Sequence, residues 1–321
     1  MIAFPRSSGI YRHLWKAIAA LSCLIILHLF YVQLHPSKAS QSALPFARPP
    51  ASEVAIPRHI WQIFFAPPDA RTIDKNDVYS SQWVSMAPGY TYTLVSDLAA
   101  AAFIDDHFKS RPEIAATYHA LKNPALKSDF TRYLLLFAKG GTYSDFDTKP
   151  VVPLEEWLEP DKRRDTRLLI APEYDESIDP HPKDFVHPVQ FCQWTIAAAP
   201  GHPILERMIN RTIASLNWVA AQQGKTLENA EISDFNVLNS TGPVAWTEVV
   251  FEWLKEVDPT IKDYTDFFQI DDPRYLRDVA ILPLATFRAD WLDDYHISWR
   301  KNRKSLVRHY FKGAWRQIPL D

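Results

Sequence analysis

Two aspartates lie two residues apart at the end of a short apolar run. In Ser144-Asp145-Phe146-Asp147 both carboxylates point to the same side of an extended chain, because side chains alternate along a strand. Aligned carboxylates are costly unless a cation or hydrogen-bond donors occupy the site. Oxygen ligands suit Mg²⁺ or Mn²⁺, which usually bridge protein carboxylates to substrate phosphates. Such pairs are common by chance, so this interpretation depends on their position in the fold.

A second group of chemically active side chains precedes this pair. Asp129, Arg132 and Tyr133 are spaced three and four residues apart in a predicted helix over residues 125–139, so they share one face. The charged pair fits either a structural ion pair at the helix edge or a binding site for an anionic ligand. The residues alone leave both interpretations open.

The elements that must position these groups alternate in type. We expect strands at 59–65, 90–95, 142–146, 167–172, 191–198 and 279–282, and helices at 74–86, 98–121 with a break at Pro112, 125–139, 203–221 and 244–256. Strands that alternate with helices predict an α/β layer architecture. Ligands of open α/β sheets bind at the carboxyl ends of strands, which favours a functional role for Asp145 and Asp147.

Composition excludes several classes of function. The chain has 321 residues, 47% of them hydrophobic, and a net charge of −3, which argues against a nucleic-acid partner. No two of its eight glycines are separated by a single residue, so a dinucleotide fingerprint is absent. Gly224-Lys225-Thr226 resembles the end of a phosphate loop, but Val219 occupies the position of the required glycine.

The N-terminal region predicts a membrane anchor. Residues 17–34 form an uncharged apolar run that is long enough for a thin membrane, after a tail, residues 1–16, with basic and no acidic residues. The tail is expected on the cytoplasmic side, with a Pro- and Ser-rich luminal stalk at 35–55 and a single catalytic domain at 56–321. A signal peptide cleaved near Ala39 is the alternative.

Two features bear on a secretory location. Asn210-Arg-Thr and Asn239-Ser-Thr are acceptor sequons for N-glycosylation, which fit a luminal body. Cys23 lies in the apolar run and Cys192 in the body, so we expect no disulfide between them.

The spacing of these groups resembles that of a known family. The pattern Asp129-x-x-Arg132-Tyr133 followed by Gly140-Gly141-x-Tyr143-x-Asp145-x-Asp147 resembles the sugar-nucleotide-binding core of glycosyltransferase family 32, in particular its fungal initiation-specific α-1,6-mannosyltransferase group. Further blocks match in the expected order: Ile56–Gln62, Gln193–Thr195, Ala199–Pro203, Asn239–Pro243 and His309–Trp315. The resemblance covers most of residues 56–316.

The resemblance implies a GT-A fold, a GDP-mannose donor and transfer that depends on Mn²⁺ (or Mg²⁺) and retains the anomeric configuration. Asp145 and Asp147 would form the Asp-x-Asp metal motif, with Asp147 the direct ligand and Asp145 nearer the ribose and a metal-bound water. His309 would contact the metal or the diphosphate. Three basic residues near it are alternatives for the diphosphate contact: Lys304, Arg308 and Lys312.

The resemblance also implies contacts with the donor. Asp129 and Arg132 would hold its hexose and diphosphate side, Trp61 would lie against the guanine, and Tyr143 beside the nucleotide. A divalent ion and a guanidinium would stabilise the charge of the leaving diphosphate.

The acceptor side is less defined. Glu173 and Asp175 follow the strand at 167–172 and are candidates for acceptor contacts, or else are solvated loop acids. No residue is assigned as a catalytic nucleophile.

The leading hypothesis is therefore a mannosyltransferase for N-glycans. We expect a single-pass type II protein of the Golgi membrane with a luminal catalytic domain, and a Golgi transferase complex is a candidate partner. Mannose transfer to inositol-phosphoceramide lipid is one alternative, and an inactive transferase-like scaffold subunit is another. A Ca²⁺-binding lectin is disfavoured, because the sequence lacks the cluster of additional oxygen ligands that a Ca²⁺ site needs. The acceptor and the linkage are not fixed by the residues.

Overall fold

A mixed sheet of seven strands lies at the centre of the computed structural model, which describes residues 55–65, 79–178, 185–287 and 305–311. In sheet order the strands are β2 (Thr91–Val95), β1 (His59–Ile63), β3 (Gly141–Ser144), β8 (Thr195–Ala198), β5 (Leu168–Ile170), β10 (Val279–Ile281) and β9 (Arg274–Leu276). Strand β1 pairs in parallel with β2 and β3, and β5 with β10. Strand β8 is antiparallel to both β3 and β5, so it joins the two parallel parts.

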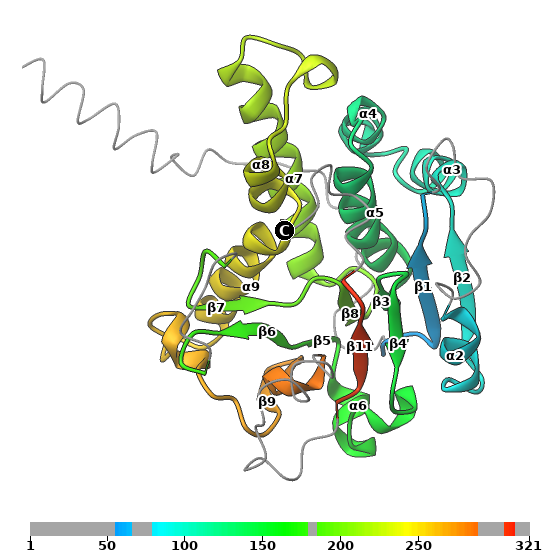
Figure 1. Cartoon of the computed structure of the whole chain (residues 1–321), viewed down its shortest axis with the longest axis vertical. Helices are drawn as coiled ribbons and strands as arrows, with labels where there is room; N and C mark the ends of the chain where they lie inside the picture. Colours follow the sequence, from blue (N-terminus) through cyan, green and yellow to red (C-terminus); the bar gives the residue numbers. More distant parts are fainter. Residues whose placement is uncertain (1–54, 66–78, 179–184, 288–304, 312–321) are drawn as a thin grey trace, which may run out of the picture. The chain divides into compact units, whose positions relative to one another are not determined.

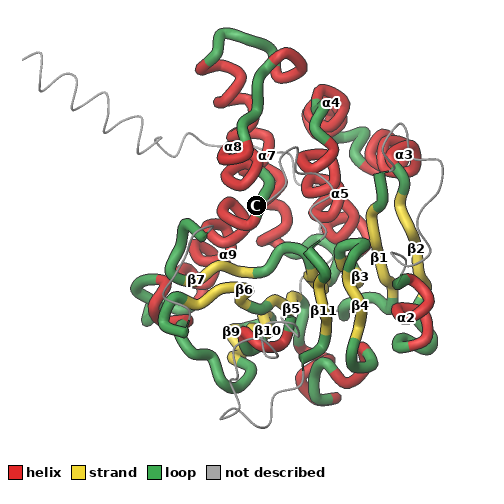
Figure 2. The backbone as a smooth tube through the Cα atoms, in the orientation of Figure 1, coloured by secondary structure: helices red, strands yellow, loops and turns green. Residues whose placement is uncertain are grey.

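The helices are α2 (Ser80–Ser85), α3 (Asp97–His107), α4 (Pro112–Ala120), α5 (Pro124–Lys139), α6 (Pro160–Asp165), α7 (Pro203–Gln222), α8 (Asp234–Ser240) and α9 (Pro243–Val257). Most of the helices lie in the upper part of Figure 2, whereas α2 and α6 lie in its lower part. Short 3₁₀ turns lie at Leu154–Glu156, Leu227–Asn229, Tyr264–Phe267 and Leu284–Thr286. Helix α7 packs against α5, α8 and α9.

Both faces of the sheet are buried. Along β5, Leu168 and Ile170 pack in the cluster that includes the helical layer, whereas Leu169 packs in a second cluster with Trp83 and Trp157. This alternation explains why the strands read as nearly continuous apolar runs, since each of their faces is covered.

Helix α5 places the charged residues next to the sheet. It begins at Pro124, where the Asn123 side chain accepts the amide hydrogen of Ala125, and it is followed by Gly140 at φ 67°. Asparagine before the first turn and proline at its first position favour helix initiation. The two ends of α5 are therefore set by local sequence.

Two small antiparallel sheets flank the main one. Strand β6 (Pro172–Asp175) pairs with β7 (Val189–Phe191), and β4 (Thr148–Pro150) pairs with β11 (Val307–His309). Figure 1 shows β11 beside β4, although the two strands are far apart in the sequence. The register places His309 opposite Thr148.

The α/β architecture predicted from the sequence is confirmed, with local differences. The expected strand at 191–198 is divided between β7 and β8, because the chain passes there from one sheet to another. The strand expected at 142–146 ends at Ser144, and the break predicted at Pro112 separates α3 from α4. Of the helix expected at 74–86, α2 is observed and residues 74–78 lie outside the described residues.

The predicted tail, anchor and most of the stalk also lie outside the described residues, which begin at Ala55. Among the described residues, no helix has both the length and the apolar character that crossing a membrane requires.

Candidate functional site

The two aspartates lie in a turn between β3 and β4. The prediction that an extended chain aligns them is wrong, because the backbone turns at Phe146 and Asp147. Thr148 closes this turn, since its amide and its hydroxyl both donate to the carbonyl oxygen of Asp145, at 3.1 and 2.5 Å. The turn between β3 and β4, and not an extended strand, brings the two carboxylates within 4.8 Å of each other.

A buried glutamine of β1 supports the turn. The Gln62 side chain donates to the Asp145 carbonyl oxygen at 2.8 Å and accepts a hydrogen bond from the Tyr92 hydroxyl at 2.8 Å. Gln62 is fully buried. Gln62 was not predicted as a site residue, although a polar residue within an otherwise apolar strand is the signal that indicates such a role.

Asp145, Asp147 and His309 converge. Each contributes one possible ligand atom, and these three atoms lie within 4.8 Å of one another. His309 Nε2 is 3.0 Å from Asp147 Oδ1, and His309 Nδ1 is buried without a hydrogen-bond partner among the described residues. Two carboxylates and an imidazole form a donor set that fits a divalent cation.

Three basic residues were alternatives to His309 for the diphosphate contact, and only Arg308 among them lies in the described part of the chain. Lys304 and Lys312 lie outside the described residues. Arg308 is next to His309 in β11, so its side chain points to the opposite face of the strand. His309 is therefore the described C-terminal residue that reaches the two aspartates.

Arg132 joins the helix to the turn. Its Nη2 lies 2.6 Å from Asp129 Oδ1 and 3.3 Å from Asp145 Oδ1, and its Nη1 donates to the Gln193 carbonyl oxygen at 3.2 Å. The guanidinium lies 4.8 Å from the ring centre of Tyr143, whose hydroxyl donates to Asp145 Oδ1 at 2.5 Å. These contacts fix one oxygen of Asp145, whereas Asp147 is the aspartate that contacts His309.

Burial shapes the charges of this group. It raises the pKa of Asp129 to about 6, even though Arg132 and a hydrogen bond from the Thr241 hydroxyl at 3.0 Å act in the opposite direction. Burial also disfavours the charged form of Arg132, but the surrounding anionic groups outweigh it and hold the pKa of Arg132 well above its ordinary value. Arg132 therefore stays a cation that orients Asp129 and Asp145.

Trp61 is buried under the site. It is 8% exposed, its indole N–H donates to the Gly140 carbonyl oxygen at 2.8 Å, and its ring stacks on His59 at 3.7 Å. Gly141, which follows Gly140, must be glycine, because a Cβ there would lie 2.6 Å from the His59 carbonyl oxygen. The role of Trp61 beside a nucleotide base stays a prediction.

Glu173 and Asp175 are buried on β6, so their interpretation as solvated loop acids is wrong. The two oxygens of Glu173 accept hydrogen bonds from the Gln190 amide and the Trp194 indole, both at 2.8 Å. Asp175 accepts the amide hydrogens of Ser177 and Gln269 at 3.0 and 2.6 Å. Their role on an acceptor side stays a prediction.

Trp194 connects Glu173 to the aspartates. Its ring centre lies 4.5 Å from that of His309, and its N–H is the donor to Glu173. Neither Trp194 nor Thr241 was predicted as a site residue, and only the fold brings them to His309 and Asp129.

The two sequon asparagines lie on helices. Asn210 is exposed on α7 and accepts a hydrogen bond from Arg111 at 2.7 Å. Asn239 is on α8, two residues before Thr241, and is partly buried.

Comparison with known proteins gives one domain match. The model of the glycosyltransferase sugar-binding region containing DXD motif matches residues 74–163. This segment includes Asp129, Arg132, Tyr143 and both aspartates of the turn, but not His309. The central mixed sheet is the GT-A-like α/β architecture that the resemblance implied.

Three curated proteins are similar over most of the chain. The initiation-specific alpha-1,6-mannosyltransferase of Schizosaccharomyces pombe is 32% identical over 81% of this chain, which spans 64% of that protein, slightly less than two thirds. The protein of the same name from Candida albicans is 29% identical over 81% of this chain and 72% of its own length. The putative glycosyltransferase HOC1 of Saccharomyces cerevisiae is 28% identical over 89% of this chain and 72% of its own length.

Proposed function

This chain carries the DXD-containing glycosyltransferase domain and is homologous to the fungal initiation-specific alpha-1,6-mannosyltransferases, and on that premise we propose that it transfers mannose from GDP-mannose to an N-glycan. The transfer would be metal-dependent, with Mn²⁺ or Mg²⁺, would retain the anomeric configuration and would form an α-1,6 linkage. The mannose and the α-1,6 linkage are proposed from the names of the relatives, GDP-mannose and the N-glycan acceptor from the family resemblance, and the site supplies the physical support.

One observation carries the proposal. Asp145, Asp147 and His309 meet beside the Asp129–Arg132 pair, within a chain whose relatives are named mannosyltransferases. A nucleotide sugar carries a diphosphate, and a carboxylate cluster can hold that anion only through a cation. The donor set therefore supports a diphosphate-linked substrate.

The residues of the site would have different roles in holding the cation and the donor. Asp147 and His309 would hold the cation, and Asp145 is oriented by Arg132 and Tyr143 to face the same space. When bound, the cation supplies electrostatic stabilisation of the leaving diphosphate. The buried Nε of Arg132 has no hydrogen-bond partner among the described residues, so this guanidinium keeps one donor for an incoming group.

The transfer breaks the bond between C1 of mannose and a diphosphate oxygen, and GDP departs with the electron pair. An acceptor hydroxyl oxygen bonds to C1, and its proton passes to an oxygen of the departing diphosphate. We assign no catalytic nucleophile, so retention would require the acceptor to approach from the face that the diphosphate leaves.

We also propose a location. Residues 17–34 would anchor the protein in the Golgi membrane as a single-pass type II protein, with the catalytic domain in the lumen. The basic tail and the later sequons support this orientation. Protease protection of the full chain in sealed microsomes tests it, since only the tail should be digested.

The experiment that tests the activity measures GDP release by the full chain. GDP-mannose, GDP-fucose and UDP-glucose are supplied with and without Mn²⁺, together with a high-mannose glycan, inositol-phosphoceramide or water as acceptor. We expect release that needs GDP-mannose, Mn²⁺ and the glycan. Turnover with the lipid alone would replace the acceptor, and a folded chain that binds neither Mn²⁺ nor GDP would favour a scaffold.

A matched pair of variants tests the cation site. Asp147→Asn should abolish metal-dependent turnover and weaken Mn²⁺ binding, because it removes a ligand charge with little change of shape. Asp161→Asn, in the exposed first turn of α6, should leave both unchanged. Full Mn²⁺-dependent activity in a folded Asp147→Asn chain would overturn the assignment.

A further inference from the structure

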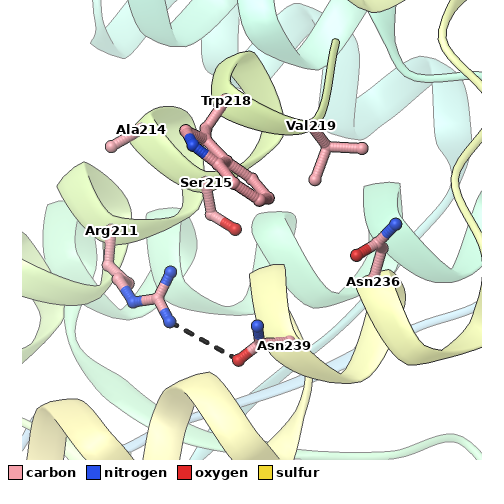
Figure 3. A pocket seen from close by; sticks show the side chains of 7 residues that line it. All are labelled: Arg211, Ala214, Ser215, Trp218, Val219, Asn236 and Asn239. Atoms are coloured by element: carbon pink, nitrogen blue, oxygen red, sulfur yellow. Dashed lines mark hydrogen bonds between the residues drawn. The ribbon is translucent and has the colours of Figure 1, made fainter. Parts of the chain in front are cut away.

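A cavity of about 390 Å³ lies between α7 and α8. It is lined by Arg211, Ala214, Ser215, Trp218, Val219, Asn236 and Asn239, which Figure 3 shows from close by. Its volume is within the range of small-ligand sites. None of these residues belongs to the cluster of Asp145, Asp147 and His309.

The lining has the chemistry that recognises carbohydrate. Trp218 is 61% exposed and offers an apolar ring face, against which the C–H face of a sugar ring can pack. Asn236 and Asn239 lie three residues apart on one face of α8, and their amides offer donors and acceptors for hydroxyl groups. A single exposed aromatic residue is ordinary, but here it lines a cavity together with the polar side chains of Arg211, Ser215, Asn236 and Asn239.

One wall of the cavity is also an attachment point. Asn239 is the acceptor of the sequon Asn239-Ser240-Thr241. Its Oδ1 accepts a hydrogen bond from Arg211 at 3.5 Å, and Arg211 is held in turn by Glu248 at 2.9 Å. The Nδ2, to which an N-linked glycan is joined, is turned toward the side of the cavity where Ser215 and Trp218 lie (Figure 3).

We infer that this cavity is the seat of an N-linked glycan on Asn239, with its first sugar packed against Trp218. The inference rests on the luminal placement proposed above, and not on the transferase activity. Asn210, the other sequon asparagine, does not line the cavity and accepts a hydrogen bond from Arg111 instead. Of the two sequon asparagines, Asn239 is the one that lines this cavity.

The surroundings of the sequon fix the order of events. Ser240 and Thr241 are buried, with the Ser240 hydroxyl 2.7 Å from that of Ser215 and the Thr241 hydroxyl donating to Asp129. An enzyme that reads the sequon cannot reach these side chains once α8 is packed on α7. The glycan must be attached before α8 docks, and the sugar then enters the cavity as the helix folds.

The first measurement is occupancy. The full chain is produced in a eukaryotic secretory host, its glycans are removed enzymatically in heavy-oxygen water, and the labelled asparagines are identified by mass spectrometry. We expect Asn239 to be labelled in most molecules. A chain whose Asn239 is unlabelled overturns the inference, and protease protection of the same microsomes then shows separately whether the luminal placement has failed as well.

The second measurement is the role of Trp218. Trp218→Ala should lower the melting temperature of the glycosylated chain by about 2 °C and have no further effect in the Asn239→Gln background, as expected for coupled groups. Trimming the glycan on Asn239 to its first sugar should leave the melting temperature of the chain unchanged. Asn210→Gln is the control variant, and the effect of Trp218→Ala should be the same in its background as in the parent chain. Equal effects of Trp218→Ala with and without the glycan would overturn the proposed seat.

Discussion

His309 Nε2 lies 3.0 Å from Asp147 Oδ1, although 162 residues separate them in the sequence. The backbone accounts for this proximity. Strand β11 pairs with β4 in a register that places His309 opposite Thr148, and the Tyr310 amide donates to the Asp147 carbonyl oxygen at 3.0 Å. The imidazole is thus held by a strand ladder, which orients a ligand more firmly than a free loop does.

Trp194→Phe should weaken metal binding through His309. The phenyl ring keeps part of the contact with His309 but leaves a Glu173 oxygen without its indole donor, which costs about 1–3 kcal/mol of unfolding free energy. Loss of such a supporting contact reduces metal affinity by about 10- to 100-fold. Mn²⁺ titration and urea unfolding measure the two effects.

The matched control is Trp246→Phe, which removes a buried indole donor to the Cys192 carbonyl oxygen. This variant should lose stability and retain Mn²⁺ affinity. If both variants bind Mn²⁺ like the parent chain, Trp194 does not position His309.

Thr241→Val should destabilise the protein more at pH 8 than at pH 5. The hydroxyl of Thr241 lowers the pKa of Asp129, so its removal should raise that pKa above about 6. Because burial raises the folded pKa above the unfolded value, the stability contributed by this group is full below pH 4 and is lost as the pH rises through 6. Urea unfolding at the two pH values gives the difference.

Because Thr241 belongs to the Asn239 sequon, the comparison is made in the Asn239→Gln background. Thr241→Ser keeps the hydroxyl and should behave like the parent. A pH-independent loss in Thr241→Val would show that the hydroxyl acts on packing and not on the carboxylate of Asp129.

His202→Asn should reduce the loss of stability in acid. His202 is buried at the start of α7, where its ring accepts the Ile204 amide hydrogen at 3.3 Å. Burial lowers its pKa although Asp278 opposes the shift, so its contribution is full above pH 6.5 and is lost as the pH falls and the unfolded chain takes up a proton.

Asparagine keeps the helix cap and cannot titrate. The slope of unfolding free energy against pH below 6.5 should therefore decrease by up to about 1.4 kcal/mol per pH unit relative to the parent. Unfolding midpoints in urea between pH 5 and 8 measure the slope. Parallel curves for the two proteins would contradict the prediction.

Gly141→Ala should disrupt the pairing of β1 with β3. The residue has φ 107°, and a Cβ there would lie 2.6 Å from the His59 carbonyl oxygen and 3.1 Å from the Trp61 indole nitrogen. Backbone strain and the clash together should cost about 3–5 kcal/mol. Thermal and urea unfolding measure the loss.

Gly224→Ala is the control for backbone strain alone. Gly224 also has a positive φ, 62°, but a Cβ there meets nothing within 4 Å. It should cost only about 1 kcal/mol. Similar losses in the two alanine variants would mean that the approach of β1 to Gly141 is not the limiting contact.

Local signals predicted the helices better than the strands. Pro124, Gly140 and the break at Pro112 mark helix ends, and these predictions held because capping depends on neighbouring residues. The divided strand at 191–198 was not predicted. Apolar periodicity does not reveal where a chain leaves one sheet for another, since that depends on pairing with distant strands.

The site divides in the same way. Asp145 and Asp147 were found from their spacing, and His309 through a family resemblance. Gln62, Thr241 and Trp194 were not predicted as site residues, because each acts on a group far away in the sequence. Side-chain partners of this kind become visible only once the topology is known.

The pairing of β11 with β4 also determines when the nascent chain can complete this group of residues. Synthesis runs from the N-terminus at about 5–20 residues per second, and β4 leaves the ribosome long before Val307–His309. Until then Asp147 has no imidazole partner, whatever else has folded. A translating or truncated chain that lacks β11 therefore lacks the imidazole beside Asp147, and the set of Asp145, Asp147 and His309 is complete only once β11 has paired with β4.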